Sequence, residues 1–146
     1  MSQQNAVASY EAGRQLLERG RRAITGGKLS KATEAFSSAI ACFAGPTSLL
    51  GGGHAWRGLA EVAVGQSRWE EAIAALDSAE QLFKLGVLQQ ASLKRNVDVD
   101  RQLAEGILVC GIARSDVALR QGDLAGARAR LNEAIPHARF AGPQGR

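Results

Sequence analysis

Three stretches of the chain, residues 27–43, 67–83 and 122–138, repeat one order of large and small apolar residues. The repeated positions are Leu29, Ala32, Phe36, Ala39 and Ile40 in the first stretch, Trp69, Ala72, Leu76 and Ala79 in the second, and Leu124, Ala127, Leu131, Ala134 and Ile135 in the third. Steps of three and four residues place such positions on one face of an α-helix. Each stretch therefore predicts an amphipathic helix whose alanines allow a neighbouring helix to come close.

A second helical segment precedes each stretch, at about residues 6–25, 53–65 and 98–121. In the last of these segments an apolar stripe is formed by Leu103, Ile107, Cys110, Ala113 and Val117. Aromatic residues make up only 5% of the chain, and β-branched residues are also few, which favours helix over strand. The sequence predicts an all-α protein with a single domain over residues 1–146, built of antiparallel helix hairpins at roughly 6–44, 53–95 and 98–141.

The predicted turns carry residues that end and start helices. Gly26-Gly27 and Gly122-Asp123 allow left-handed backbone followed by a helix start. Ser67 with Glu70 predicts a capping box. A break is expected near Asn96, with Asp98 and Asp100 favouring the first turn of the next helix.

Two further breaks repeat four residues, Phe43-Ala44-Gly45-Pro46 and Phe140-Ala141-Gly142-Pro143. Glycine ends a helix and proline prevents its restart. We expect the loop at about residues 45–53, which includes Gly51-Gly52-Gly53, to be the most flexible connection and to act as a hinge before the next helix.

With the helices placed, the pattern resembles the tetratricopeptide repeat (TPR) family. The matching residues are Leu16, Gly20, Ala23, Gly27, Leu29, Ala32, Phe36 and Ala39 in the first hairpin, Trp56, Leu59, Ala60, Ala63, Trp69, Ala72, Leu76 and Ala79 in the second, and Gly111, Ser115, Ala118 and the positions from Gly122 onward in the third. The resemblance covers nearly the whole chain and implies a short TPR-like α-solenoid of three hairpins. A generic helical bundle with alanine-rich seams is the alternative.

The repeat spacing departs from that family. Its period is about 34 residues, whereas 40 residues separate Ala32 from Ala72 and 55 separate Ala72 from Ala127. The helices must be longer here, and we expect the outer helix of the second hairpin to extend past Phe83 towards Arg95.

The resemblance also implies a concave groove lined by the first helix of each hairpin. Carried over position by position, the groove residues are Arg14, Leu17, Arg21, Ile24, His54, Arg57, Glu61, Val64, Val109, Ile112, Asp116 and Leu119. The arginines would form a basic side, and Leu17, Ile24, Ile112 and Leu119 an apolar floor. This groove would suit an acidic or amphipathic segment of another protein, helical or extended. The alternative is that the arginines only solvate the surface. Family members that grip a C-terminal carboxylate have Lys and Asn where this chain has Leu17 and Arg21, so that clamp is not expected.

The charge balance adds a second class of function. The chain carries 18 basic and 14 acidic residues, a net charge of +4, and its isoelectric point is near 9.6. A basic nucleic-acid-associated helical protein is therefore the alternative to an adaptor or an assembly or regulatory subunit. The arginines are scattered singly among carboxylates, without dense runs or stacking aromatics, which argues against nucleic acid.

Patterns typical of catalysis or metal binding are incomplete. Gly51 to His54 follows no predicted strand and lacks the ending of a phosphate loop. Asn96, Asp98 and Asp100 have the first spacings of a calcium loop, but Arg101 replaces its glycine and Ile107 its glutamate. His54 and His137 lack ligands at metal spacing, and Cys42 and Cys110 read as buried reduced thiols. We expect no enzyme activity, no cofactor and no metal.

The ends of the chain give two more expectations. The N-terminus lacks the features of a signal peptide, and no window is apolar enough to span a membrane, so we expect a cytoplasmic protein. No helix follows the third hairpin, and repeat arrays must cover their terminal apolar faces. We therefore expect a homo-oligomer or a larger complex that forms through this C-terminal hairpin.

Overall fold

The computed structural model describes residues 3–45, 48–92 and 96–137. Over these residues the chain is helical, with no strand. The α-helices are α1 (Gln3–Thr25), α2 (Leu29–Cys42), α3 (Leu49–Gly65), α4 (Trp69–Ser92), α5 (Val97–Arg120) and α6 (Leu124–Ala134), followed by a 3-10 turn, η2 (Ile135–His137). The all-α prediction is confirmed, and α4 continues past Phe83 as the long repeat spacing predicted.

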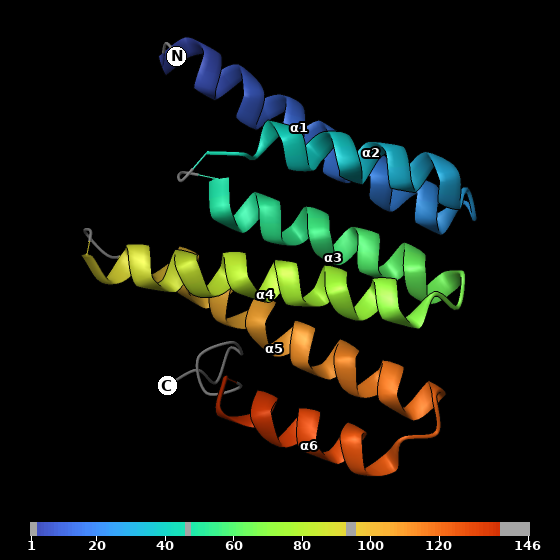
Figure 1. Cartoon of the computed structure of the whole chain (residues 1–146). Helices are drawn as coiled ribbons and strands as arrows, with labels where there is room; N and C mark the ends of the chain where they lie inside the picture. The colour runs from blue at the N-terminus through green and yellow to red at the C-terminus, as the bar shows by residue number, and fades with distance from the viewer. Residues whose placement is uncertain (1–2, 46–47, 93–95, 138–146) are drawn as a thin grey trace.

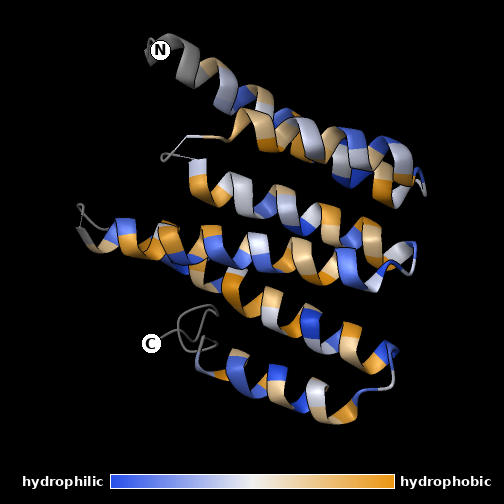
Figure 2. Cartoon of the chain, in the orientation of Figure 1, coloured by the Kyte–Doolittle hydropathy of each residue, from blue (hydrophilic) through white to orange (hydrophobic). Residues whose placement is uncertain are grey.

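The helices lie side by side in chain order, each roughly antiparallel to the next (Figure 1). Every helix packs against its successor, and α3 also contacts both α1 and α5. Along the helices, hydrophobic and hydrophilic positions alternate in stripes (Figure 2). The buried stripes of α2 and α4 include Ala32, Ala39, Ala72 and Ala79, each with no exposed surface. These alanines allow the close helix contacts that their spacing predicted.

Phenylalanine rings from α2 and α4 are wedged between glycines of the helices on either side. Phe36 of α2 lies between Gly20 of α1 and Gly58 of α3, and a Cβ atom at either glycine would come within 3.0 Å of the ring. Phe83 of α4 has the same relation to Gly53 of α3 and Gly106 of α5. Each ring thus fills a space that exists only because both flanking positions lack a side chain.

This packing corrects the expected hinge at Gly51-Gly52-Gly53. The three glycines lie inside α3, which begins at Leu49 and not at residue 53. A Cβ at Gly51 would meet the ring of Phe43, and one at Gly53 would meet the ring of Phe83. Each helical glycine costs about 1 kcal/mol in propensity, and the packing of rings against the bare backbone offsets that cost.

The turns within the three hairpins share one geometry. Gly27, Ser67 and Gly122 have positive φ angles of 72°, 57° and 81°. In each turn the next residue closes a Schellman-type bond of 2.8 Å, from the N–H of Lys28, Arg68 and Asp123 to the carbonyls of Ala23, Ala63 and Ala118.

The predicted capping box at Ser67 is therefore wrong, because Ser67 takes the left-handed position and α4 begins only at Trp69. The predicted helix start near Asn96 is confirmed. The Asn96 side chain accepts hydrogen bonds from the N–H groups of Asp98 and Val99, at 3.0 and 3.2 Å. Asp123 caps α6 in the same way, accepting from the N–H of Gly126 at 2.8 Å.

The third stripe is only half buried. Ala127 and Ala134 pack against α5, but Leu124, Leu131 and Ile135 are 72%, 42% and 63% exposed. In α2 and α4 the matching large residues face the next first helix, and α6 has no such helix among the described residues. The repeated segment at Phe140 to Pro143 lies outside the described residues. Association through this hairpin stays a prediction.

Where the structure is described, no helix combines the length and hydrophobicity that crossing a membrane requires.

Candidate partner-binding groove

The twelve residues predicted to line a groove all lie on α1, α3 and α5. Because α3 contacts both other helices, these residues belong to neighbouring elements. They differ in exposure: Arg14, Arg21, Glu61, Ile112, Asp116 and Leu119 are exposed, Ile24, His54, Arg57, Val64 and Val109 are partly buried, and Leu17 is buried. Leu17, predicted as part of the apolar floor, is 7% exposed, and Arg57, predicted on the basic side, is partly buried.

A pocket of about 460 Å³ lies between α1 and α3. Its lining is Tyr10, Glu11, Arg14, Gln15, Leu17, Glu18 and Arg21 from α1, Phe43 beyond α2, Leu50, Gly51 and His54 from α3, and Gln102 from α5. The pocket brings together four of the predicted groove residues, Arg14, Leu17, Arg21 and His54. The other eight do not line this pocket.

The wall on α1 carries both signs of charge. Arg14 lies 3.6 Å from Glu11, and both side chains are more than half exposed. Glu18 also lines the pocket. The uniformly basic side that the sequence suggested is therefore partly neutralised at Arg14, whereas Arg21 has no carboxylate partner among the described residues. On α5, Asp116 pairs with Arg120 at 2.9 Å.

His54 joins the pocket to the interior of the helix stack. Its ring meets Phe83 edge-on, with centroids 5.5 Å apart, and Arg57 donates from Nη1 to His54 Nδ1 at 3.4 Å. Burial, with the positive charges of Arg57 and Arg21, lowers the pKa of His54 from 6.5 to about 4. His54 is therefore neutral at pH 7. Because Nδ1 accepts from Arg57, its proton belongs on Nε2.

Arg57 also acts on Cys110 of α5. Burial raises the pKa of the Cys110 thiol to about 12, the charge of Arg57 lowers it, and that of Asp77 raises it. The charge of Arg57 thus reaches both His54 of α3 and Cys110 of α5. The thiol stays protonated at neutral pH, so it is not poised as a nucleophile.

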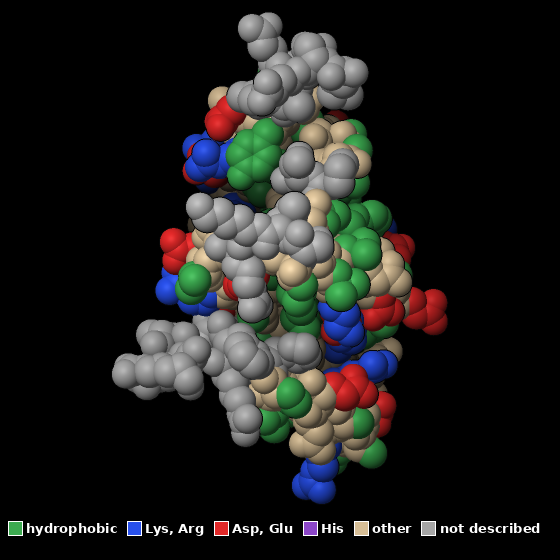
Figure 3. All heavy atoms as spheres, turned by 90° about the vertical axis from the view of Figure 1, so that its left-hand side faces the viewer, with side chains coloured by type: hydrophobic (Ala, Val, Ile, Leu, Met, Phe, Trp, Pro, Cys, Tyr) green, Lys and Arg blue, Asp and Glu red, His purple; other side chains and the backbone are tan. Residues whose placement is uncertain are grey.

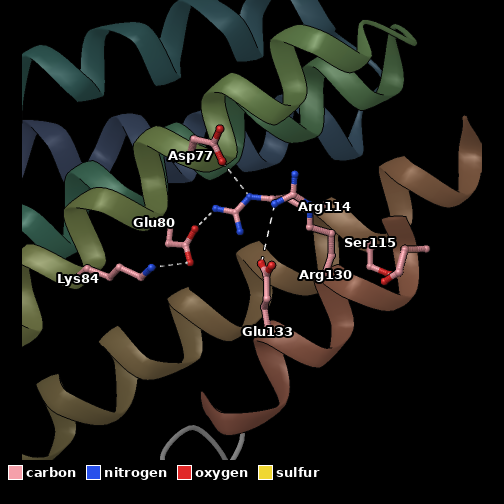
Figure 4. Close-up of polar contacts among 8 residues, drawn as sticks. Asp77, Glu80, Lys84, Arg114, Ser115, Arg130 and Glu133 are labelled. Atoms are coloured by element: carbon pink, nitrogen blue, oxygen red, sulfur yellow. Dashed lines mark hydrogen bonds and ion pairs between the residues drawn. The ribbon is translucent and has the colours of Figure 1, made fainter. Parts of the chain in front are cut away.

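Arg114 of α5 is a buried cation that the sequence analysis missed. It is 5% exposed, donates from Nε to Asp77 at 2.9 Å, and pairs through Nη2 with Glu80. Lys84 lies 3.2 Å from the other oxygen of Glu80. Figure 4 shows Arg114 reaching from α5 to the two acids on α4. A signal was present, because Arg114 lies in the three-and-four stepping of the apolar stripe between Cys110 and Val117.

A hydrogen bond attaches the last hairpin nearby. Ser115 donates from Oγ to the carbonyl of Ala127 at 2.9 Å, and Gly111 lies so close to Ala134 that a Cβ there would collide. The contacts of Arg114 and Ser115 hold α4, α5 and α6 together and are not part of the pocket.

The face that carries the α4–α5 connection shows a different surface. There, hydrophobic side chains are exposed at mid-height among charged ones (Figure 3). The exposed apolar residues of these two helices include Leu85, Leu88 and Val97, at 51%, 67% and 79%. Among the described residues, no three His, Cys, Asp or Glu side chains lie close enough together to hold a metal ion.

No protein-family model, curated protein or solved structure matches the chain. The resemblance to tetratricopeptide repeats therefore depends on the residue pattern alone.

Proposed function

We propose that this chain is a protein-interaction module with a TPR-like arrangement, which holds a helical or extended segment of another protein along α1, α3 and α5. In this role it would act as an adaptor or as an assembly or regulatory subunit. The proposal includes no catalytic step, cofactor or metal.

The observation that carries the proposal is the pocket of about 460 Å³ between α1 and α3. Its lining combines apolar surface from Tyr10 and Leu50 with charged groups at Arg14 and Arg21. Grooves between helices that bind peptide segments combine apolar contacts with charges that fix register. A pocket of this composition suits one or two side chains of a bound segment.

The unbalanced charge of the pocket supports an acidic partner. Glu11 offsets Arg14, but Arg21 faces the pocket without a carboxylate partner among the described residues. Surface charges of this kind steer association and set register more than they supply affinity. Their effect should weaken with salt, because the Debye length is about 10 Å at 0.1 M.

Site-specific crosslinking tests the location. A photo-reactive residue at Gln15, which lines the pocket, should capture a partner from the native source. The same residue at Ala129, exposed on α6, should not. Capture that disappears after nuclease treatment would instead support the nucleic-acid alternative.

Charge reversal tests the mechanism. Arg14→Glu with Arg21→Glu should reduce capture, and the loss should shrink as salt is added. The matched control is Arg128→Glu with Arg130→Glu on α6, which changes the net charge equally, also at exposed positions. Equal losses from the two double variants would mean that diffuse charge, and not this pocket, attracts the partner.

A further inference from the structure

Arg57 stands apart from the other arginines in its surroundings. Among the arginines of the described residues, it alone is both shielded from solvent and without a carboxylate. The more deeply buried Arg114 has two acids against it. The guanidinium of Arg57 makes a long hydrogen bond, 3.4 Å, to Nδ1 of the neutral His54 imidazole. A partly buried guanidinium without a counter-charge is costly in free energy, so this position is suited to an incoming anion.

A second unpaired cation comes from the neighbouring helix. Arg21 of α1 lines the pocket with His54, and Arg21 and Arg57 both act electrostatically on the same imidazole. Nδ1 of His54 accepts from Arg57, which leaves Nε2–H as a donor. Arg21 and His54 therefore offer hydrogen-bond donors to the pocket, and Arg57, which does not line it, adds positive charge next to His54. None of these three side chains carries an acceptor oxygen.

We propose that Arg21 and His54, with the charge of Arg57 beside His54, form a carboxylate subsite that binds an acidic side chain of the partner segment. When the carboxylate binds, Arg57 releases Nδ1 of His54, and Nδ1 takes up a proton from solvent while Nε2–H donates to the carboxylate. This inference rests on the proposed function, since it specifies the chemistry of the segment held in that pocket. It adds a regulatory property, because partner binding then depends on pH.

The direction of the pH dependence follows from the neighbours of His54. In the free protein, burial and the two arginines keep its pKa near 4. A bound carboxylate offsets the arginine charges and stabilises the imidazolium, which raises that pKa. Between the free and bound pKa values, binding takes up a proton, and affinity increases by up to about tenfold for each unit that the pH falls.

Other charged and polar groups also surround His54. From α1, Glu11, Arg14 and Glu18 line the same pocket, and Glu11 is paired with Arg14. Phe83 of α4 offers only its ring edge, and Gln102 of α5 does not titrate.

Cys110 of α5, which the charge of Arg57 also reaches, keeps its proton, with a pKa of about 12. The proposal therefore assigns the proton that is taken up on binding between pH 5.5 and 8 to His54.

The test uses the full chain and a rhodamine-labelled hexaglutamate peptide capped at both ends. Fluorescence anisotropy should give a dissociation constant that falls at least threefold from pH 7.5 to 5.5. His54→Gln should lose this dependence, so that its dissociation constants at pH 7.5 and 5.5 agree, whereas Arg21→Gln should weaken binding at both pH values and keep the dependence. Arg128→Gln is the control for a lost surface cation. Circular dichroism at each pH confirms that the variants are folded.

A second measurement follows the proton directly. Imidazole NMR of His54, in a His137→Gln background, should show its pKa rising from about 4 to about 6 or higher when the capped peptide is added, since a threefold change in the dissociation constant requires a rise of that size. The same peptide with a free C-terminal carboxylate should bind equally well, since a glutamate side chain fills the subsite. If only the uncapped peptide bound, the subsite would recognise a C-terminal carboxylate and the proposal of a side-chain carboxylate would be wrong. Unchanged pH dependence in His54→Gln would overturn the inference. Loss of crosslinking at Gln15 would instead remove the proposed function, so the two failures are distinguishable.

Discussion

Gly58→Ala is the sharpest test of the helix packing. The added methyl group would lie within 3.0 Å of the ring of Phe36, closer than real Cβ atoms approach a neighbour. The ring has little room to retreat, because it also lies against Gly20 of α1, where an added Cβ would come similarly close to it. Phe36 is only 1% exposed, so the strain must be relieved by moving α1 or α3.

Two terms of opposite sign set the magnitude. Alanine is favoured over glycine inside a helix by about 1 kcal/mol. Overpacking a filled interior costs about 1–3 kcal/mol, and a ring held on both sides should be at the upper end. We expect Gly58→Ala to lower the free energy of unfolding by about 1–2 kcal/mol.

Gly65→Ala, in the same helix, is the matched control. A Cβ there would lie 3.5 Å from Leu29 Cδ1, an ordinary contact. Because only the propensity term remains, this variant should be neutral or more stable by up to about 1 kcal/mol.

Urea unfolding followed by circular dichroism measures these changes, provided that the slope with denaturant stays constant. In a Phe36→Leu background the cost of Gly58→Ala should shrink, giving a coupling energy of about 1 kcal/mol or more. If Gly58→Ala were as stable as Gly65→Ala in both the parent and the Phe36→Leu background, the packing of the Phe36 ring between glycines would be refuted.

Two further predictions concern buried charge. Glu80→Gln should destabilise the protein by about 1–3 kcal/mol, because it removes the charge of the more buried of the two acids that pair with Arg114. Asp77→Asn should cost under about 1 kcal/mol, because the Asp77 side chain is 57% exposed. Equal losses of unfolding free energy in urea would contradict this order. The second prediction concerns His54, whose pKa is about 4 in the folded protein against 6.5 for an unperturbed histidine. Between these values the unfolded chain binds a proton that the folded chain does not, so stability falls as the pH drops from 6.5 to 4, by up to about 3 kcal/mol. The unfolding free energy of His54→Gln should fall less than that of the parent between pH 6.5 and 4. Equal falls in the two proteins would show that groups other than His54 are responsible.

Helix stripes were readable from the sequence because they depend on local spacing. Ala32, Phe36, Ala72 and Leu76 are buried as their period predicted. The role of Gly51-Gly52-Gly53 was not readable, since local propensity marks three glycines as a break. Only the rings of Phe43 and Phe83, brought in from other helices, explain why the backbone stays helical there.

The candidate site shows the same division. Position within a hairpin was enough to bring Arg14, Arg21 and His54 to one pocket. The bond between Arg57 and His54 joins two residues three apart within α3, but the burial of Arg57 depends on how α3 lies against its neighbours, which no single-helix pattern contains. Arg114 was missed because a charged side chain at a buried helix contact is stable only if acids on another helix meet it.

The wedged rings make the hairpins unequal as building blocks. Phe36 and Phe43, seven residues apart on the chain, both lie between glycines of α1 and α3. Of the described phenylalanines, Phe83 alone lies between α3 and α5. A hairpin duplicated within this stack, or inserted into it, would need glycines on both flanking helices wherever a phenylalanine ring packs. When the chain is pulled from its ends, the junction with one ring should open before the junction with two, so the third hairpin would detach while the first two stay locked together.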